Sequence, residues 1–589
     1  MNQPILYKTF DQLSFVDMLV YTNLPKHPFW SFVEDHIDFS FADRLCSVLY
    51  TGRGQRPYAP SLKLKVHLVG TYYALSDRQT EEKIMGDLFI KRFLRLPVDF
   101  FGFDHSTIGL DRQRMGHAMF QACHLYVLAQ MYSLGLWGDR EERWIIDSFP
   151  TNAGVIALGA YKLIQQAILR VVNHLKRGHA ALYSFANQTL DFSPLTLRLS
   201  SGSETKERLL AFSRLVALGH ALLHFFDTEQ AILLFSGERW KAVRLRSMAL
   251  QHTLARILQE NSRPANAKDA DDLPPSAGED SGPEESVADK PAEADNVPTR
   301  EEPSPAATEP TTSAQEAVIE YEKIPHEERP SDRLVSPSHT DVRKGMKTAF
   351  QVIKGFKTQN LCTEHGVILG TRVVPANEHD RDAMVDMVSE VIGFFKVTPG
   401  AVLGDTAYGH GKQRAQLQGM NVSVIAPVPT APNPTSLYDI SRFSYDPQKD
   451  VFRCPNNHES YRKNYNKNLS GTQHYFHKQN CSECPFQKKC TTSEKGRSVF
   501  RSDYAEHYEE AANFNKSIEG KEAMSRRYVV ERKNQEMKNN CGMGAPNATS
   551  KKTLSMKAVL AGIVVNLKLV VRALTGPKPE FLRRGALAR

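Results

Sequence analysis

The sequence lacks the features that direct a chain out of the cell or into a membrane. Residues 1–8 contain no apolar core after a basic start, so we expect no secretory signal. The longest apolar run, residues 558–571, is interrupted by Asn566 and Lys568 and is too short and too polar to span a bilayer. We therefore expect a cytoplasmic protein without membrane contact, in which this run forms a buried helix.

Several common catalytic patterns are also missing. The sequence shows no Ser–His–Asp set, no Walker phosphate loop and no dinucleotide-binding glycine fingerprint. These absences argue against serine hydrolases, P-loop nucleotide hydrolases and nicotinamide-dependent dehydrogenases. Cysteine is scarce, with 8 residues in 589, and in a chain without a signal peptide this indicates a reducing compartment. Clustered thiols in such a compartment suggest a metal site before disulfides.

The charge of the chain is distributed very unevenly. The net charge of +8 combines an acidic segment with a basic remainder. Residues 261–330 hold 18 acidic and 6 basic side chains, a net of −12, so the remainder carries +20. Residues 525–589 hold 14 Lys or Arg against 3 acids, a net of +11. A basic body favours a polyanionic partner, and a phosphate backbone is the usual one.

The pattern of the chain predicts an α/β protein with helical additions. Residues 1–140 show short helical periodicities with Ser76 or Asp77 as a helix cap, which suits a DNA-binding helical module or a helical domain without a ligand. Residues 155–260 also read as helices. Residues 262–335 contain all 11 prolines of 261–330 and cannot bury enough apolar surface to offset chain entropy, so we expect a disordered acidic linker.

Two apolar runs end in an aspartate. Residues 143–147 read Arg-Trp-Ile-Ile-Asp147, and Pro150 is expected to break any continuation. Residues 401–405 read Ala-Val-Leu-Gly-Asp405 and precede a turn and a helix. A hairpin over 348–375 and a strand after residue 421 complete a mixed sheet covered by helices. The carboxyl ends of such strands usually hold ligands, although a helix cap or turn also explains Asp147.

A third acid lies in a predicted late helix between two cations. Arg527, Glu531 and Lys538 are four and seven residues apart, which keeps them within roughly 60° on one helix face. A salt-bridged surface helix explains this pattern, and so does a metal-binding carboxylate between two phosphate-binding cations. The rival acid, Glu536, lies about 140° round the helix from Glu531 and lacks flanking cations on its face.

Together, Asp147, Asp405 and Glu531 can hold a pair of divalent cations. Hard oxygen ligands select Mg²⁺ or Mn²⁺. Such a pair activates an attacking water or 3′-hydroxyl and stabilises the leaving oxygen.

A cysteine cluster interrupts the α/β pattern at 440–495. One C-x2-C pair and two further cysteines supply four thiolates, the number of a structural zinc site; they are Cys454, Cys481, Cys484 and Cys490. The histidines His458, His474 and His477 are alternative ligands. Free buried thiols remain the other interpretation.

At this point the chain resembles bacterial insertion-sequence transposases with an Asp-Asp-Glu triad on an RNase H-like fold. The R-x3-E-x6-K signature is matched by Arg527, Glu531 and Lys538, and Asp405 is followed by Tyr408 at +3. Further landmarks are Gly355-Phe-Lys, the segment 375–380 (Pro-Ala-Asn-Glu-His-Asp), Val565-Asn-Leu-Lys568 and the N-terminal segments 52–54, 75–78 and 105–106. The cysteine insert is similar to that of one subgroup. Met524 replaces the tyrosine that usually stands three residues before the arginine.

The resemblance implies a DNA transposase that cuts the ends of a mobile element and transfers the 3′-hydroxyl into target DNA, as a homodimer on DNA in the bacterial nucleoid. It implies Mg²⁺ at Asp147, Asp405 and Glu531, and DNA phosphates at Arg527 and Lys538. The alternatives are a domesticated, non-catalytic DNA-binding protein and an RNase H-like nuclease without strand transfer. The expected parts are 1–140 (helical N-terminal domain), 141–160 (first strand), 161–261 (helical insertion), 262–335 (linker), 341–435 (core), 440–495 (cysteine insert), 500–575 (C-terminal helices) and 576–589 (basic tail).

Overall fold

The computed structural model describes residues 5–10, 12–51, 54–139, 141–197, 204–265, 319–346, 351–429, 436–546 and 548–576. These residues form two compact units, of which unit 1 comprises Met1–Ile156 and Asp341–Arg589 and unit 2 comprises Ala157–Thr340. Unit 2 is therefore an insertion in the chain of unit 1. Residues 266–318 of the predicted linker and residues 577–589 of the predicted basic tail lie outside the described residues.

The N-terminal part of unit 1 is helical. Its elements are α1 (Phe15–Asn23), α2 (Trp30–His36), α3 (Phe41–Leu45), η1 (Cys46–Leu49), α4 (Pro60–Tyr72), α5 (Asp77–Gly86), α6 (Leu88–Leu94) and α7 (His105–Ser133). Ser76 caps α5, because its hydroxyl accepts from the Gln79 N–H while the Gln79 side chain accepts from the Ser76 N–H. The long α7 bends at Gly116, whose φ of 67° lies in the left-handed region that favours glycine.

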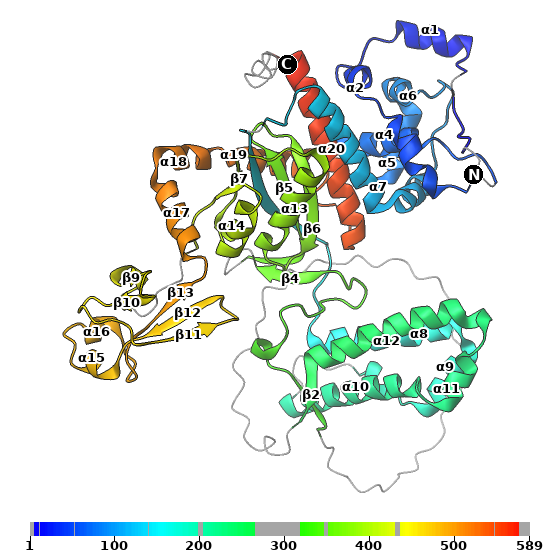
Figure 1. Cartoon of the computed structure of the whole chain (residues 1–589). Coiled ribbons are helices and arrows are strands. Elements are labelled where there is room, and N and C mark those ends of the chain that lie inside the picture. Colours follow the sequence, from blue (N-terminus) through cyan, green and yellow to red (C-terminus); the bar gives the residue numbers. More distant parts are fainter. Residues whose placement is uncertain are drawn as a thin grey trace, which may run out of the picture. The chain divides into compact units, whose positions relative to one another are not determined.

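A mixed sheet forms the centre of unit 1 (Figure 1). Its strands are β1 (Arg143–Asn152), β4 (Arg343–Met346), β5 (Val352–Thr363), β6 (Ile368–Pro375), β7 (Ala401–Leu403) and β8 (Ser423–Ile425). The order is β4-β5-β1-β7-β8, with β6 paired to β5. β1 is antiparallel to β5 and parallel to β7, and β7 is parallel to β8. The predicted hairpin is present as β5 and β6, and the mixed sheet agrees with the RNase H-like fold that we expected.

The first strand is longer than the sequence indicated. β1 continues past Asp147 and through Pro150 to Asn152, so the expectation that the strand ends at the acid is wrong. The reason lies in its partners: β5 pairs along β1 as far as Asn152, whereas the pairs with β7 end at Ile145. Beyond Ile145 one side of β1 has no strand partner among the described residues. A proline is tolerated there because its missing N–H breaks no ladder bond.

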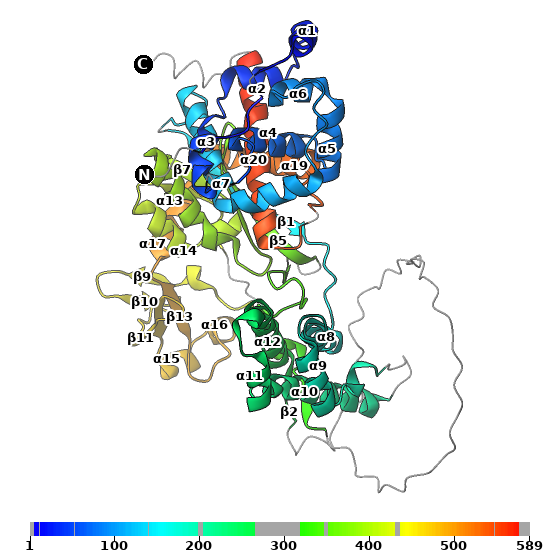
Figure 2. The same ribbon diagram turned by 90° about the vertical axis from the view of Figure 1, so that its right-hand side faces the viewer.

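Helices surround this sheet in the C-terminal half of unit 1. They are η5 (Asp380–Ala383), α13 (Met384–Phe395), η6 (Thr406–Tyr408), α14 (Gly411–Gln418), α17 (Ala505–Lys516), α18 (Ile518–Ser525), α19 (Tyr528–Asn540) and α20 (Lys551–Thr575). Figures 1 and 2 show α20 running beside α7 and α4, and it also packs on β6. By length and composition α20 could cross a membrane, but 78% of its apolar window is buried inside the protein. The prediction of a buried helix here is confirmed.

Asn566, which interrupts the apolar run of α20, has a structural use. Its side chain accepts a hydrogen bond from the Ile368 N–H (2.8 Å) and donates one to the Ile368 carbonyl (2.8 Å). It also contacts His124 Nε2 of α7 at 3.1 Å. A single buried amide therefore ties β6 of the sheet to α20 and to the N-terminal helices.

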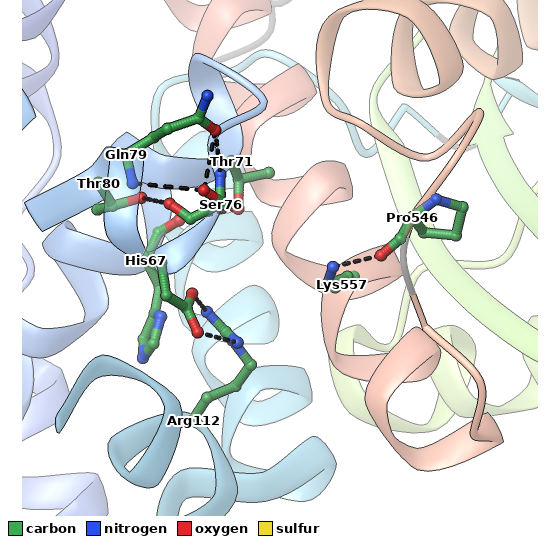
Figure 3. A network of polar contacts seen from close by, with 9 residues as sticks. His67, Thr71, Ser76, Gln79, Thr80, Arg112, Pro546 and Lys557 are labelled. Carbon is green, nitrogen blue, oxygen red and sulfur yellow. Dashed lines mark hydrogen bonds and ion pairs between the residues drawn. The ribbon is translucent and has the colours of Figure 1, made fainter. Parts of the chain in front are cut away.

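The N-terminal helices also meet the loop that follows α19. Figure 3 shows this polar region, in which Arg112 of α7 forms two hydrogen bonds to Asp77 of α5, one of them 3.1 Å long. Across from this pair, the Lys557 ammonium donates to the Pro546 carbonyl. Burial lowers the pKa of the nearby His67 to about 3, so this imidazole is neutral. The Lys557 bond ties the chain that leads from α19 to α20, and this chain and the N-terminal helices line one pocket.

Unit 2 is mostly helical. Its elements are α8 (Ala160–Gly178), α9 (Ala180–Thr189), η2 (Ser193–Leu195), α10 (Thr205–Phe225), α11 (Glu229–Phe235), η3 (Glu238–Trp240), α12 (Lys241–Asn261), β2 (Ser262–Pro264), β3 (Tyr321–Lys323) and η4 (His326–Glu328). The apolar face of α8 packs against α10 and α12, and Ile164, Ile168 and Val171 are fully buried there. By length and composition, α10 and α11 together could also form a membrane span, but the two helices are bent by 62° at the break between them.

Both ends of the predicted linker are ordered, contrary to the expectation for 262–335. β2 and β3 pair antiparallel, with Ser262 opposite Lys323. Arg263 forms ion pairs with Glu322 and, at 2.7 Å, with Glu328. The Tyr321 ring stacks on His220 of α10 with 5.1 Å between the ring centroids. Ion pairing and aromatic packing thus fix residues that composition alone assigned to a disordered segment.

The cysteine-rich insert of unit 1 has small sheets and short helices of its own. They are η7 (Ile440–Arg442), β9 (Ser444–Asp446), β10 (Val451–Arg453), β11 (Arg462–Asn466), β12 (Gly471–Tyr475), α15 (Lys478–Ser482), α16 (Gln487–Cys490) and β13 (Ser498–Ser502). Its apolar core consists of Phe443, Phe452, Phe476, Cys490 and Val499. A core of this size gives little stability by itself.

Candidate active site

Two acids lie just beyond the parallel pairing of β1 with β7 at the centre of the sheet. β1 and β7 pair in parallel from Arg143 opposite Ala401 to Ile145 opposite Leu403. Asp147 and Asp405 each follow the last of these pairs by two residues. Because paired strands lie about 4.8 Å apart, this register brings the two carboxylates into one region. It is the carboxyl edge of β7, where open α/β sheets hold ligands.

The pKa of Asp147 reports the charges around it. It is raised from 3.8 to about 6, chiefly because burial disfavours the charged carboxylate. The negative charges of Asp405 and Glu531 raise this pKa further, whereas the Ser148 N–H and the positive charge of Arg527 lower it. Asp147 therefore lies within electrostatic reach of both other acids and of one of the two predicted cations.

Asp405 begins the turn that follows β7. Its Oδ1 accepts a hydrogen bond from the Ala407 N–H (2.8 Å) and caps η6. This turn buries Tyr408 completely. Burial, together with the charges of Asp380, Asp147 and Asp405, raises the pKa of Tyr408 well above its usual value. The phenol is therefore neutral and forms part of the wall behind the acids.

Asp380 is a fourth acid in this region to which the sequence assigned no role. Its Oδ2 accepts a hydrogen bond from the Ser148 hydroxyl (3.0 Å), and its Oδ1 pairs with Lys357 Nζ at 2.7 Å. Because Lys357 already neutralises its charge, Asp380 is suited to support β1 beside Asp147 rather than to bind a cation. Asp380 is the last residue of the landmark segment 375–380, and this segment was the sequence signal that could have identified it.

Glu531 lies in the first turn of α19, with Arg527 just before the helix begins. Arg527 Nη2 lies 3.9 Å from Glu531 Oε1, and the Glu531 side chain is 59% exposed. An ion pair this long and this exposed contributes little stability. Arg527 Nε is buried and has no hydrogen-bond partner among the described residues. The pair is therefore poorly explained as a stabilising surface contact.

Lys538 lies near the other end of α19 and faces the same strand as Glu531. Its Nζ is 4.9 Å from the ring centroid of Phe149, which follows Asp147 by two residues on β1. Glu536 instead forms an ion pair with Lys533 at 3.0 Å. Of the two candidate third acids, Glu531 is the one whose charge acts on Asp147.

Further cations line a groove along the exposed side of α19. We call it the α19 groove; its lining includes Arg526, Tyr528, Glu531, Arg532 and Arg572. The three arginines form no ion pair with a described residue, and the Arg532 guanidinium lies 6.0 Å from the Tyr528 ring centroid. Free arginines beside an exposed aromatic ring suit nucleic-acid phosphates and bases. The sequence analysis did not predict this groove. The excess of basic residues in 525–589 was the signal that could have indicated it.

The acids do not form a closed metal cage. Within the described ranges, the group of His, Cys, Asp and Glu side chains whose ligand atoms all lie within 4.8 Å of one another is Glu81, Asp104 and His105. That group is explained by local structure, because Asp104 caps α7 and Glu81 accepts from the His105 N–H (3.1 Å). The ligand atoms of Asp147, Asp405 and Glu531 do not all lie within 4.8 Å of one another.

The four cysteines of the insert line one small cavity together with His458. Burial raises the pKa of Cys490, and the negative charges of the other three cysteines as thiolates raise it further, whereas Arg497 lowers it. Backbone N–H groups of His458 and Arg497 donate to Cys454 Sγ (3.4 Å) and Cys481 Sγ (3.5 Å). The other candidate histidines lie elsewhere: His474 contacts the ring of Phe452, and His477 contacts the ring of Tyr461. The remaining cysteines, Cys46, Cys123, Cys362 and Cys541, are buried.

Comparison with known proteins gives two matches. Residues 323–567 match the family model described as "Transposase DDE domain", and residues 19–114 match the one described as "Transposase domain (DUF772)". The first match does not include Asp147, because unit 2 separates β1 from the rest of the core. No curated protein and no solved structure matches the chain.

Proposed function

Because the chain belongs to the insertion-sequence transposases of the DDE type, we propose that it cuts DNA at the ends of a mobile element and joins the freed 3′-hydroxyl to target DNA. The observation that carries this proposal is the meeting of three acids far apart in the sequence. Asp147 lies on β1 two residues beyond its last pair with β7, and Asp405 follows β7. The charge of Glu531 on α19 acts on Asp147. A helix whose Glu only stabilised a surface would have no need to bring its charge to a buried acid of the sheet.

The proposed cofactor is a pair of Mg²⁺ or Mn²⁺ ions held by Asp147, Asp405 and Glu531. Carboxylate oxygens are the ligands that these hard cations prefer. Burial and like-charge repulsion raise the pKa of Asp147, and a divalent cation would relieve that repulsion. When bound, the ions would activate the attacking water or 3′-hydroxyl and stabilise the leaving oxygen.

The proposed DNA contacts follow from the cations beside the triad. Arg527 has a buried Nε for which the described part of the chain provides no acceptor, and an incoming phosphate oxygen would satisfy it. Lys538 lies over Phe149 near Asp147, where it would hold a second phosphate. The arginines of the α19 groove add to this basic surface beside Glu531. Since two element ends are cut, we propose that the chain acts as a homodimer on DNA.

The decisive experiment uses DNA that carries the inverted repeats flanking the reading frame, with purified protein, Mg²⁺ and a supercoiled target plasmid. We expect cuts at both ends with free 3′-hydroxyls, followed by products in which these ends are joined to the plasmid. Cleavage without joined products would identify a nuclease. Sequence-specific binding without cleavage would identify a domesticated DNA-binding protein, and either result would contradict the proposal.

Arg527→Lys and Lys538→Ala are expected to weaken cleavage about 10- to 100-fold. Lysine keeps the charge of Arg527 but loses the planar fork that binds two phosphate oxygens. Removing the charge of Lys538 should also reduce the slope of log affinity against log salt by about one, as expected for one lost phosphate contact. Cleavage rates and binding at several salt concentrations measure both effects. Lys206→Ala, at an exposed position of unit 2, is the control, and equal behaviour of Lys538→Ala and this control would contradict the assignment.

The metal-free protein is expected to lose stability as pH rises from about 4 to 6, in part because of Asp147. Its folded pKa of about 6 lies above the unfolded value of 3.8, so the folded state binds the extra proton in this window and loses that advantage above it. At pH 7 the charged carboxylate costs up to about 3 kcal/mol. Asp147→Asn should therefore raise the melting temperature of the metal-free protein at pH 7.

The same variant should lose the stabilisation that Mg²⁺ or Mn²⁺ gives the wild type at pH 7. Thermal unfolding at pH 4, 5, 6 and 7, with and without metal, measures both effects. The exposed Asp227 of unit 2 provides the control Asp227→Asn. A metal-dependent rise in melting temperature that persists in Asp147→Asn would show that Asp147 does not hold the ions.

A further inference from the structure

Asn534 of α19 is buried against β1 and touches the first acid. Its Nδ2 donates a hydrogen bond to Asp147 Oδ2 (2.8 Å), and the residue is 4% exposed. It follows Glu531 by three residues and so lies about one helical turn away on a neighbouring part of the same face. One amide therefore connects the helix that carries the third acid to the strand that carries the first.

The orientation of this amide is set by a second buried asparagine. Asn360 lies opposite Asp147 on β5 and is fully buried. Its Nδ2 donates to Asn534 Oδ1 (2.7 Å) and also contacts Met537 Sδ at 3.1 Å. Because Asn534 Oδ1 is the acceptor of this bond, Asn534 Nδ2 is the group turned toward Asp147. Both donors in this relay thus point toward the carboxylate.

A neutral donor suits this position better than a charged one. The site already contains the three acids of the triad and Asp380, so a carboxylate at 534 would add repulsion. A lysine or arginine would bring a cation that competes with the metal for Asp147. The amide occupies Oδ2 without adding charge, and this contact leaves Oδ1 of Asp147 available. Removing a hydrogen bond that orients a metal-binding side chain in this way usually lowers the affinity for the metal.

We propose that Asn534 is a positioning residue that holds Asp147 with one oxygen available to the metal and fixes α19, and with it Glu531, against β1. The proposal rests on the proposed function, because it requires Asp147 to be a metal ligand. Asn534 acts through Asp147 and needs no contact with DNA. Asn360 acts one step further away, by orienting Asn534.

The test compares Asn534→Ala and Asn534→Asp with the wild type in the full-length protein. Mn²⁺ binding is measured by calorimetry without DNA, and the Mg²⁺ concentration for half-maximal cleavage is measured with element-end DNA. We expect both variants to bind Mn²⁺ about 10- to 100-fold more weakly and to require correspondingly more Mg²⁺. Affinity for end DNA should stay within about threefold of the wild type, because phosphate contacts supply it.

The aspartate variant separates the lost hydrogen bond from lost packing, because it keeps the shape of the side chain but cannot donate when ionised. Asn187→Ala, at an exposed helical position of unit 2, is the control for truncation of an asparagine. As a single substitution, Asn360→Ala should weaken Mn²⁺ binding. In the Asn534→Ala background it should cause no further loss, and a double-mutant cycle measures this difference. Independent, additive effects of the two substitutions would contradict the relay.

Two outcomes separate this inference from the proposed function. If Asp405→Asn loses Mn²⁺ binding while both Asn534 variants bind like the wild type, the positioning role is wrong and the metal site stands. If the wild type neither binds Mn²⁺ nor cleaves end DNA, the proposed function fails and the inference fails with it.

Discussion

Replacing Asp147 or Asp405 by asparagine, or Glu531 by glutamine, is expected to lower Mg²⁺-dependent cleavage of element-end DNA by at least about 10³-fold. Metal ions contribute several kcal/mol of transition-state stabilisation, and each 1.36 kcal/mol is a tenfold change in rate. Each amide keeps the size of the side chain but removes the negative charge that holds the ions. Cleavage and strand transfer are measured on labelled end DNA under single-turnover conditions.

Binding of end DNA should survive these substitutions, since the cations of Arg527, Lys538 and the α19 groove remain. It is measured with Ca²⁺ in place of Mg²⁺. The matched control is Glu536→Gln on the same helix, because Glu536 pairs with Lys533 and its removal leaves the triad intact. If Glu536→Gln loses cleavage while Glu531→Gln retains it, the third acid is Glu536 and our assignment of Glu531 is wrong.

The second large effect is expected in the cysteine-rich insert. We predict one Zn²⁺ per chain, held by Cys454, Cys481, Cys484 and Cys490, and loss of the ordered insert when zinc is removed. Four thiols line one cavity, and backbone N–H groups already donate to two of them, as they do for thiolates. A structural zinc contributes about 10–16 kcal/mol of apparent binding free energy in zinc-finger peptides, far more than the small apolar core of the insert can supply.

Zinc content is measured by mass spectrometry, and order in the insert by limited proteolysis of its many lysines and arginines. Cys484→Ser and treatment with a strong chelator should both make residues 436–502 sensitive to protease, while the helices α8 and α12 of unit 2 stay resistant. Ser482→Ala is the neighbouring control, because Ser482 is exposed. A purified wild type without zinc whose insert resists protease would favour free buried thiols instead.

The parts of the site that the sequence indicated are those with a local pattern. Asp405 follows a short apolar strand and precedes a glycine-containing turn, and the structure has this arrangement. Glu531 with Arg527 is a pattern within one helix, whose periodicity is visible from the residues alone. The buried helix at 558–571 follows in the same way from its apolar composition.

The predictions that the structure corrected, the end of β1 and the order of the acidic segment, depend on contacts with distant residues. Pro150 breaks strands only where its N–H is needed, and the end of the pairing with β7 makes it unnecessary there. The ends of the acidic segment are ordered because Arg263 forms ion pairs with Glu322 and Glu328, which are 59 and 65 positions away in the sequence. Composition cannot reveal such pairs, because it averages over residues that a fold brings together individually.

By itself, the sequence determined the α/β class and the helical additions, because helix and strand periods are local properties of the chain, and it singled out the three acids and their flanking cations as candidates. Only the tertiary structure decided that β1 and β7 are adjacent and parallel, that the charge of Glu531 rather than Glu536 acts on Asp147, and that Asn534 donates a hydrogen bond to that carboxylate. Asp147 and Asn534 are separated by 387 positions. A hydrogen bond over such a separation is set by the packing of a helix on a sheet, and no spacing in the sequence encodes it.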